Sequence, residues 1–332
     1  MPRIVVTGGA GFIGSNLVAA LNERGERDIL VVDRLGDGPK WRNLVDLAFA
    51  DYMEREAFRA ALRGGRLGPA QAVVHLGACS RTTETDASFL FDNNTEFTDE
   101  LCAWCLHNGA RFVYASSAAT YGDGAAGYGD GEADLAALRP LNMYGYSKHL
   151  FDRWAADRGL FDRIVGLKFF NVFGPREDHK GTMRSMVLKA FEQIDETGRV
   201  RLFCSEREGI EDGEQKRDFL YVDDAVRVVL HFLDHPETGG LFNVGAGKAR
   251  TWNDLARAVF KAMGIEVRIE YIDLPPELAD RYQYYTQADI RKLRSAGYTT
   301  PFLSLEDGVS DYVTRFLLPR VQGESAEESA RA

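Results

Sequence analysis

The chain has 332 residues, of which 45% are hydrophobic, and its formal net charge is −10. A chain of this size and composition can bury a substantial core in one large domain or two modest ones. The negative charge argues against a nucleic-acid-binding or anionic-membrane-binding surface. No apolar run approaches the roughly 20 residues that span a bilayer, and the chain begins with a strand-like segment rather than a basic and then apolar leader. We therefore expect a cytoplasmic protein that binds neither nucleic acid nor membrane.

The cysteines do not form a recognisable metal site. There are four of them, Cys79, Cys102, Cys105 and Cys204, and Cys102 and Cys105 make one CxxC pair inside a run of helical character. Because no second pair accompanies it, the spacing does not match a zinc site, and we predict no metal. Reduced core thiols are the better interpretation.

A glycine-rich segment follows the first apolar strand. Residues 4–6 are Ile-Val-Val, and Gly8, Gly11 and Gly14 then form a GxxGxxG pattern before a helical run over residues 15–23. Glycine permits a tight turn and a close approach of the backbone to a pyrophosphate, whose charge faces the helix N-terminus. The segment predicts a dinucleotide-binding loop.

Short apolar strands alternate with helical stretches through the first half of the chain. The expected strands cover residues 29–32, 48–50, 72–76, 113–117 and 164–170, and helices are expected near 54–63 and 84–107. This alternation implies a parallel sheet with helices on both faces. The fold class expected is α/β, a Rossmann-type doubly wound parallel sheet with a smaller C-terminal substrate domain.

The sequence pattern changes after residue 170. We expect residues 1–170 to form the Rossmann domain, to which some later strands and helices return. Residues 171–320 should form mainly a substrate-binding domain, in which Thr251 caps a helix. Residues 321–332 are rich in Glu, Ser and Ala and should be frayed.

Tyr144 and Lys148 lie four residues apart, so their side chains project from one face if the segment is helical. A free phenol has a pKa of about 10, and a neighbouring ammonium should lower that pKa into a useful range for proton transfer. Ser117, at the carboxyl end of a predicted strand, can hydrogen-bond the same substrate oxygen. Taken alone, the pair also fits a buried tyrosine beside a solvated lysine.

Together, the glycine loop, the strand ending at Ser117 and the Tyr144–Lys148 pair resemble the extended short-chain dehydrogenase/reductase family in order and spacing. The resemblance covers nearly the whole chain and implies a Ser–Tyr–Lys triad at Ser117, Tyr144 and Lys148. It also implies a nicotinamide cofactor, held by Gly8, Gly11, Phe12, Ile13, Gly14, Asp33, Arg34, Lys40, Arg55, Leu76, Gly77, Ala78, Cys79, Ser80, Asn93, Tyr144, Lys148, Val172 and Lys180.

The residues expected at the adenosine end of that cofactor favour two different cofactors. Asp33 closes the second predicted strand, where an acidic residue usually binds the ribose 2′-hydroxyl of NAD. Arg34, Lys40 and Arg55 can instead hold the 2′-phosphate of NADP, although Lys40 and Arg55 also fit solvated surface cations. We expect NADP, with Arg34 and Lys40 as the phosphate contacts. Asp51, after the third predicted strand, is expected to contact the adenine.

Two features narrow the reaction. Ala118 and Ala119 follow Ser117 where sugar-nucleotide 4,6-dehydratases carry an Asp-Glu pair, so dehydration is disfavoured. Several segments resemble a family of sugar-nucleotide epimerases, the ADP-glyceromanno-heptose 6-epimerases, and the most distinctive of them is 171–181. The others are 77–84, 92–94, 213–219, 281–283 and 286–289.

This resemblance implies inversion at the exocyclic C6 of ADP-D-glycero-D-manno-heptose to give ADP-L-glycero-D-manno-heptose, for the lipopolysaccharide inner core. It implies NADP that is reduced and reoxidised within one turnover, and a homo-oligomer, with a pentamer among the family's assemblies. The implied substrate contacts are Ser117, Asn171, Thr182, Lys189, Phe203, Cys204, Ser205, Glu206, Arg217 and Tyr282. A histidine also occurs in the family at position 189, and the loop 206–215 does not map residue by residue.

Several of these residues fit a second interpretation. Arg217 suits a bidentate contact with a diphosphate, or else a surface salt bridge with Asp218. Phe203 and Tyr282 can stack on a ring or simply fill the core. At the level of the whole protein, the alternatives are a UDP-hexose 4-epimerase with bound NAD and a catalytically silent NADP-binding sensor. A sensor would have no need of the Ser–Tyr–Lys triad, which is complete here.

Lys180 is expected to be a second proton-transfer group. Inversion by oxidation and reduction requires the ketone to present its opposite face, and a half-turn about C5–C6 achieves this. The carbonyl oxygen then swings away from Tyr144, so reduction needs another donor. Lys180 lies beyond the strand that ends at Asn171, and burial near a cofactor would lower its pKa. A fixed cation on a phosphate is the alternative role.

Overall fold

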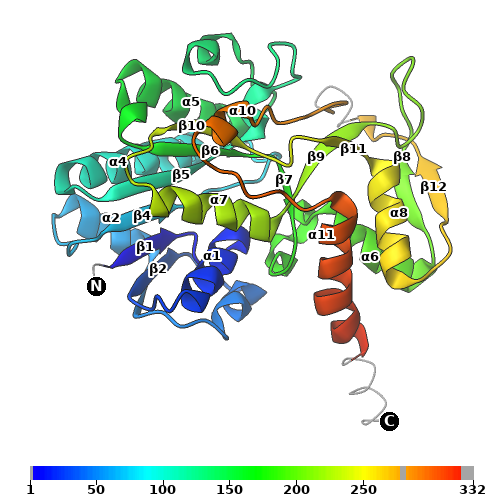
Figure 1. Ribbon diagram of the computed structural model, residues 1–332, viewed down its shortest axis with the longest axis horizontal. Helices are drawn as coiled ribbons and strands as arrows, with labels where there is room; N and C mark the ends of the chain where they lie inside the picture. Colours follow the sequence, from blue (N-terminus) through cyan, green and yellow to red (C-terminus); the bar gives the residue numbers. More distant parts are fainter. Residues whose placement is uncertain (1–2, 277–281, 323–332) are drawn as a thin grey trace.

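The computed structural model describes residues 3–276 and 282–322, and a seven-stranded sheet forms its centre (Figure 1). The strand order is β10-β6-β5-β4-β1-β2-β3. The strands are β1 (Ile4–Thr7), β2 (Ile29–Asp33), β3 (Asp51–Glu54), β4 (Ala72–His75), β5 (Arg111–Ser117), β6 (Val165–Phe169) and β10 (Gly240–Val244). Every neighbouring pair is parallel, so the expected doubly wound α/β fold is confirmed.

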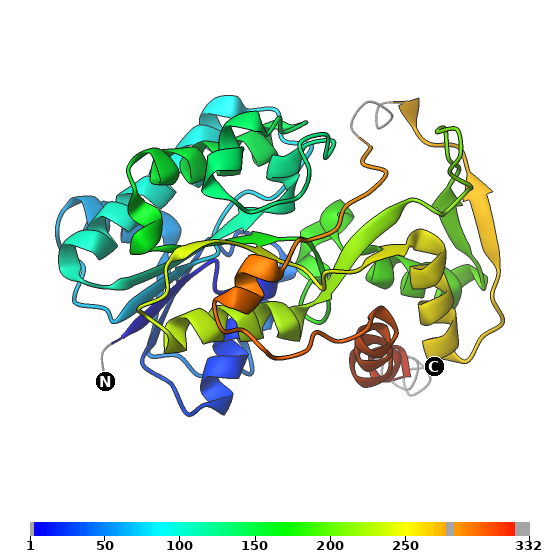
Figure 2. The ribbon, with the colours of Figure 1, turned by 45° about the horizontal axis from the view of Figure 1, so that its top comes forward.

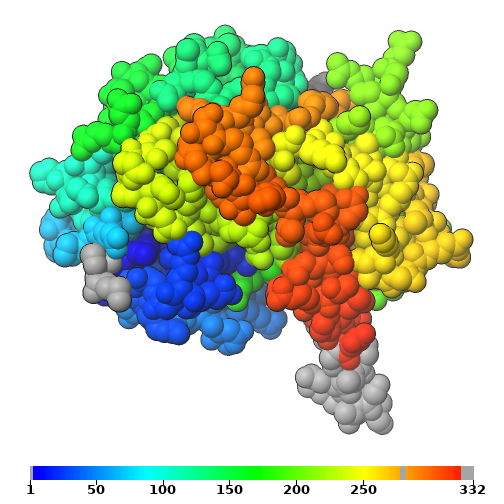
Figure 3. Space-filling model, in the orientation of Figure 1, coloured from blue at the N-terminus to red at the C-terminus, as the bar shows by residue number. Residues whose placement is uncertain are grey.

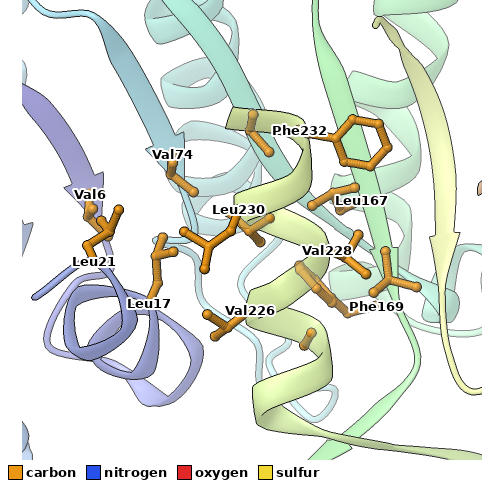
Figure 4. Close-up of a cluster of buried hydrophobic side chains, with 14 of the residues drawn as sticks. Val6, Leu17, Leu21, Val74, Leu167, Phe169, Val226, Val228, Leu230 and Phe232 are labelled. Atoms are coloured by element: carbon orange, nitrogen blue, oxygen red, sulfur yellow. The ribbon is translucent and has the colours of Figure 1, made fainter. Parts of the chain in front are cut away.

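Helices cover both faces of this sheet. On one face, α1 (Phe12–Glu23) and α7 (Val222–Asp234) lie side by side and pack their apolar side chains onto β1, β4 and β6 (Figure 4). On the other face lie α2 (Arg55–Arg63), α4 (Phe97–Asn108) and α5 (Met143–Asp157). Strands β1, β2, β4, β6 and β10 are buried along their whole length, which accounts for their apolar sequences.

One predicted strand is displaced along the chain. Residues 48–50 do not form a strand because the Asn22 side chain takes both backbone groups of Ala48, donating at 2.7 Å and accepting at 2.8 Å. The strand is instead β3, whose first residue, Asp51, pairs with Leu30. Asp51 therefore lies at the amino end of its strand, so the expectation that it follows the strand was wrong, and its contact with an adenine stays a prediction.

The long predicted helix over 84–107 is divided. The helix α3 (Ala87–Leu90) leads through a π-helical turn, Phe91–Glu96, into α4. The Asn94 side chain in this turn accepts from the Cys79 N–H at 2.9 Å and donates to the Cys79 carbonyl at 3.0 Å. The turn is thereby tied to the loop that follows β4, and π-helical turns of this kind are frequent at functional sites.

Two smaller sheets lie beside one end of the large sheet (Figure 2). One contains β11 (Ala249–Thr251), β9 (Lys216–Tyr221) and β7 (Asn171–Phe173), and the other contains β12 (Ile269–Ile272) and β8 (Val200–Phe203). The helices α6 (Met186–Thr197), α8 (Trp252–Met263) and α11 (Leu305–Tyr312) pack with them around a separate apolar cluster. Thr251 caps α8 as predicted, in a reciprocal capping box with Asp254.

The C-terminal segment passes from the large sheet to the smaller sheets, as the space-filling view shows in orange and red (Figure 3). Along it, α10 (Arg291–Ser295) contacts β10, and α11 contacts α8 and β9. Residues 323–332, most of the tail expected to be frayed, lie outside the described residues. In the described part of the chain, no helix is long and apolar enough to cross a bilayer.

A buried ion pair joins α5 to the centre of the large sheet. Lys168 on β6 lies 2.7 Å from Asp152 on α5, and both side chains are fully buried. Asp152 also accepts from Tyr114 and Ser116 on β5, each at 2.7 Å, while Lys168 donates to Thr120 at 2.7 Å. Because these groups satisfy one another, the network fixes α5 against β5 and β6.

Replacing Lys168 with Met should strongly destabilise the fold. The substitution leaves Asp152 without a cation in the core, so we expect the free energy of unfolding to fall by about 3–5 kcal/mol in urea titrations. Arg315→Met, which removes the partner of Asp311 in an exposed pair, is the control and should change it by no more than about 0.5 kcal/mol. A Lys168→Met protein as stable as this control would contradict the account.

Candidate active site

The glycine-rich loop between β1 and α1 has no room for side chains. Gly8 has a φ of 69°, and a β-carbon built on it would lie 2.6 Å from the amide nitrogen of Gly77. A β-carbon on Gly14 would lie 2.1 Å from the Gly8 carbonyl oxygen. The loop thus packs backbone to backbone with the segment after β4, and α1 begins at Phe12. The unpaired N–H groups of a first helical turn at this edge suit a pyrophosphate.

The carboxylate of Asp33 is engaged within the protein. Asp33 is buried at the end of β2 and accepts from the Ala10 N–H at 2.9 Å and the Arg34 N–H at 2.7 Å, while the Lys40 ammonium also donates to it. Asp33 therefore connects the glycine loop to Lys40. The Arg34 side chain is exposed and borders the same cavity as Lys40.

Two adjoining cavities, of about 280 and 250 Å³, lie at the carboxyl edge of the sheet. Every residue that the sequence predicted to hold the cofactor borders one or both of them, except Asp51, the predicted adenine contact. The larger cavity also contains Ser117. The smaller one gathers Arg34, Lys40 and Arg55 with Arg81, a cation that the sequence analysis missed because it is distant from the others along the chain.

These residues fit a nicotinamide dinucleotide. The glycine backbone forms a cradle that one added β-carbon would fill, and a cluster of cations lies at one end. Arg55 has a buried Nε with no hydrogen-bond partner among the described residues, while a terminal nitrogen of its guanidinium donates to Asn93. An unsatisfied buried donor at this position suits an anionic ligand. The described residues include no group of His, Cys, Asp and Glu that could hold a metal ion.

Tyr144 lies in the first turn of α5, beside the end of β5. Asn142 caps this helix by accepting from the Gly145 N–H at 2.8 Å. Gly145 permits a close approach, since a β-carbon there would lie 2.6 Å from a carbonyl oxygen of the segment that follows β5. This approach brings the Tyr144 phenol to Ser117, whose side chain interacts with it. Lys148 follows one turn later and is buried.

The electrostatics of this pair differ from the expectation. Burial raises the pKa of Tyr144, and the interaction with Ser117 offsets this only in part. Burial also lowers the pKa of Lys148 to about 8, although the charge of Asp152 opposes that shift. The prediction that Lys148 leaves the phenol with a lowered pKa was wrong, because the loss of phenolate solvation outweighs any attraction to the ammonium.

Lys180 approaches the same cavity from the loop between β7 and α6. Its ammonium lies 5.0 Å from the centre of the Phe12 ring, and it takes part in none of the ion pairs formed by the described residues. Burial lowers the pKa of Lys180, and Glu177 partly opposes this shift. A desolvated lysine without a paired carboxylate can exchange protons closer to neutral pH.

A third cavity, of about 610 Å³, shares Phe170, Val172 and Lys180 with the larger cofactor cavity. Four of the predicted substrate contacts border it, namely Asn171, Lys189, Phe203 and Tyr282. Arg184, Gln193, Arg201 and Trp252 also border it and were not predicted. No local motif distinguishes these four residues, because the folding of α6 and the loop before it against β8 and α8 brings them to the cavity.

The remaining predicted substrate contacts do not border the third cavity: they are Ser117, which borders the larger cofactor cavity, and Thr182, Cys204, Ser205, Glu206 and Arg217. Arg217 is buried with its guanidinium 5.6 Å from the Trp252 ring and 5.4 Å from the Tyr282 ring. It forms no salt bridge with Asp218, whose carboxylate accepts from backbone N–H groups instead. The Thr182 carbonyl accepts from the Lys189 ammonium at 2.6 Å.

The fold and this site define a class of enzymes that bind a nicotinamide dinucleotide at the carboxyl edge of a parallel sheet. The chain belongs to the NAD dependent epimerase/dehydratase family, whose model matches residues 4–245. A nicotinamide dinucleotide cofactor follows from this membership.

Among curated relatives, the chain is 54% identical to the ADP-L-glycero-D-manno-heptose-6-epimerase of Nitratidesulfovibrio vulgaris (strain DP4) over 314 residues, 94% of this chain and 97% of the relative. It is 49% identical to the enzyme of the same name from Alkalilimnicola ehrlichii over 314 residues, 93% of this chain and 96% of that one. The resemblance to the heptose epimerases is confirmed.

Solved structures agree on the fold. The ADP-L-glycero-D-manno-heptose-6-epimerase of Helicobacter pylori matches with a TM-score of 0.79 and 28% identity, covering 95% of this chain and 96% of that one. The UDP-glucose 4-epimerase of Thermotoga maritima, solved with UDP-glucose, matches with a TM-score of 0.77 and 28% identity, covering 95% and 98%. Shape alone therefore does not separate the two activities, whereas the identity to the curated relatives does.

Proposed function

We propose that the chain inverts C6 of the heptose in ADP-D-glycero-D-manno-heptose, giving ADP-L-glycero-D-manno-heptose through a 6-keto intermediate with bound NADP. The curated relatives support the substrate. The observation that supports the mechanism is that two candidate proton-transfer groups, Tyr144 and Lys180, border one cavity from separately held elements. A role in lipopolysaccharide synthesis follows from this substrate. Assembly as a homo-oligomer and a cytoplasmic location stay predictions from the sequence.

Two residues of the chain would transfer the protons, each at a different position of the substrate oxygen. When bound, NADP would supply the redox chemistry, as the hydride acceptor for the oxidation of C6 and the hydride donor for its reduction. Tyr144, with Ser117 beside it, would take the hydroxyl proton of one C6 epimer. After rotation about C5–C6, the carbonyl oxygen would lie away from Tyr144, and Lys180 would give the proton that forms the other epimer. The ADP part would occupy the 610 Å³ cavity, which Lys180 also borders.

The cation cluster supports NADP over NAD. Arg34, Lys40, Arg55 and Arg81 border one small cavity, and the buried Arg55 Nε has no partner among the residues described. The carboxylate of Asp33, which would favour NAD, already receives three protein donors. A 2′-phosphate would be met by charge-assisted hydrogen bonds at this end.

A UDP-hexose 4-epimerase is the second candidate. The matching structure of the Thermotoga maritima enzyme supports it as strongly in shape as the heptose enzyme supports the first. The higher identity of the curated heptose relatives favours the 6-epimerase, as does a second candidate donor at Lys180 for a carbonyl that rotates outside the ring.

The Tyr144→Phe variant should fold and keep its cofactor but lose activity. Removing one acid/base group typically costs about 10²–10⁴-fold in rate, so we expect a loss of that size in steady-state epimerisation. Tyr146→Phe is the matched control, because Tyr146 lies two residues along the same helix with its side chain exposed. Activity of Tyr144→Phe within a few-fold of the control would exclude Tyr144 from the mechanism.

The Arg34→Ala variant should discriminate between the cofactors. Loss of a charge-assisted contact to the 2′-phosphate should weaken NADP binding by about 10-fold or more in calorimetric titrations, and NAD binding by no more than about 2-fold. Arg42→Ala, at an exposed arginine that borders neither cofactor cavity, should affect both cofactors equally little. If Arg34→Ala weakens the binding of NADP and of NAD equally, Arg34 does not contact the 2′-phosphate.

The Lys180→Ala variant should separate the two half-reactions. In single turnovers followed by the absorbance of the reduced nicotinamide, one C6 epimer should still reduce the cofactor, while the other reduces it about 10²–10⁴-fold more slowly. Arg201→Ala, at another cation of the substrate cavity that belongs to β8, should affect both epimers alike. Wild-type rates from both epimers in Lys180→Ala would rule out the second proton-transfer group.

A further inference from the structure

The side chain of Asn43 joins the glycine-rich loop to the loop that carries Lys180, here called the Lys180 loop (residues 174–185). Asn43 lies in the short 3-10 helix Pro39–Leu44, between β2 and β3. Its amide group donates to the carbonyl oxygen of Ala10 and to that of Arg176, both at 3.0 Å. One amide group therefore spans two segments that are far apart in the sequence.

Two more contacts reinforce this junction. Arg176 donates to the backbone carbonyl of Asn43 at 2.5 Å, and Nδ1 of His179 lies 3.2 Å from the Asn43 amide nitrogen. Both hydrogens of that nitrogen already serve the Ala10 and Arg176 carbonyl oxygens, so Nδ1 of His179 can accept only a shared, three-centre contact from it, which places the ring proton on Nε2. Burial lowers the pKa of His179 to about 4, so the neutral ring keeps this contact at neutral pH.

The backbone at the junction is strained. Arg176 has a φ of 73°, and it is the one non-glycine residue with a positive φ in the described part of the chain. Such a conformation persists only where the surroundings impose it, and it is concentrated at functional sites. Here the surroundings are Asn43, which binds the Arg176 carbonyl, and Asn16 on α1, which donates to the Pro175 carbonyl at 3.0 Å.

The other end of the Lys180 loop has a separate anchor. Glu177 is fully buried and accepts from the Ser185 hydroxyl at 2.6 Å and the Ser185 N–H at 2.5 Å, where Ser185 caps α6. The Lys180 N–H donates to the Glu177 carbonyl at 3.0 Å. Lys180 thus lies between one anchor on the dinucleotide side and one on the substrate side.

We propose that Asn43 is a positioning residue for Lys180, which sets the place of its ammonium relative to the glycine-rich loop by holding Arg176 and His179. This inference rests on the proposed role of Lys180 in proton transfer for one C6 epimer. Without the Asn43 side chain, the Lys180 loop keeps its Glu177 anchor but loses its connection to Ala10. Because a displacement of about 1 Å can cost on the order of 100-fold in rate, the effect should be confined to the epimer that uses Lys180.

The test compares Asn43→Ala with Asn22→Ala. Asn22 also binds the segment between β2 and β3, through Ala48, but it makes no contact with the Lys180 loop. In single turnovers on enzyme loaded with NADP, Asn43→Ala should slow the Lys180-dependent epimer by about 10–100-fold and change the other epimer by no more than about 2-fold. Asn22→Ala should leave the ratio of the two rates unchanged. Asn43→Asp, which keeps the size but cannot donate, should behave like Asn43→Ala and serves if that variant does not fold.

A second readout does not depend on activity. In hydrogen exchange of the cofactor-free protein, the amides of residues 176–185 should exchange faster in Asn43→Ala than in wild type or Asn22→Ala. If Lys180→Ala separates the epimers but Asn43→Ala slows both equally or neither, the inference is overturned and the proposed function stands. If Lys180→Ala fails to separate them, the two-group mechanism fails, and unchanged exchange in Asn43→Ala would also remove the positioning role.

Discussion

The direct backbone contact between Gly8 and Gly77 is the constraint on which the site depends. Since neither residue has a side chain, the turns after β1 and β4 meet without a gap, and the start of α1 is drawn to the sheet edge. Thr7 stabilises this contact. Its hydroxyl lies 2.6 Å from Nδ1 of His75 and accepts from the Gly77 N–H at 3.2 Å. Any larger residue at position 8 would separate the two turns and widen the cavity that the dinucleotide should fill.

Buried and half-buried polar side chains hold the elements that carry the candidate proton-transfer groups in register with that contact. Asp152 and Lys168 fix α5, which presents Tyr144, while Asn43 and Glu177 fix the loop that presents Lys180. The two candidate proton-transfer groups therefore have independent supports. Such independence suits a reaction in which one carbonyl oxygen must receive a proton at either of two positions. Each proton donor can then be placed without displacing the other.

Much of this arrangement could be predicted from local sequence patterns. Apolar runs predicted most strands of the large sheet, and the spacing of Gly8, Gly11 and Gly14 predicted the turn, because these features depend on neighbouring residues. The prediction of a strand at residues 48–50 was wrong because the side chain of Asn22, distant in sequence, hydrogen-bonds the backbone of that segment.

The parts of the site that were missed depend on tertiary contacts. Arg81 lies inside the segment 77–84 and Trp252 lies in no recognised motif, but both border the cavities only because separate elements pack together. The pKa of Tyr144 was predicted in the wrong direction because spacing along a helix reports the neighbouring lysine but not the loss of solvent. The hydrogen bond from Asn43 to Arg176 joins residues that are 133 positions apart, so no local sequence pattern predicts it.

Epimerisation of ADP-D-glycero-D-manno-heptose in deuterium oxide, followed by NMR, tests the central claim most directly. Oxidation at C6 followed by return of the same hydrogen never exposes a carbon-bound hydrogen to solvent. The account therefore predicts the C6 epimer with no deuterium on carbon, and no conversion of UDP-galactose under the same conditions. Deuterium on C5 or C6 of the product, or faster conversion of UDP-galactose, would contradict it.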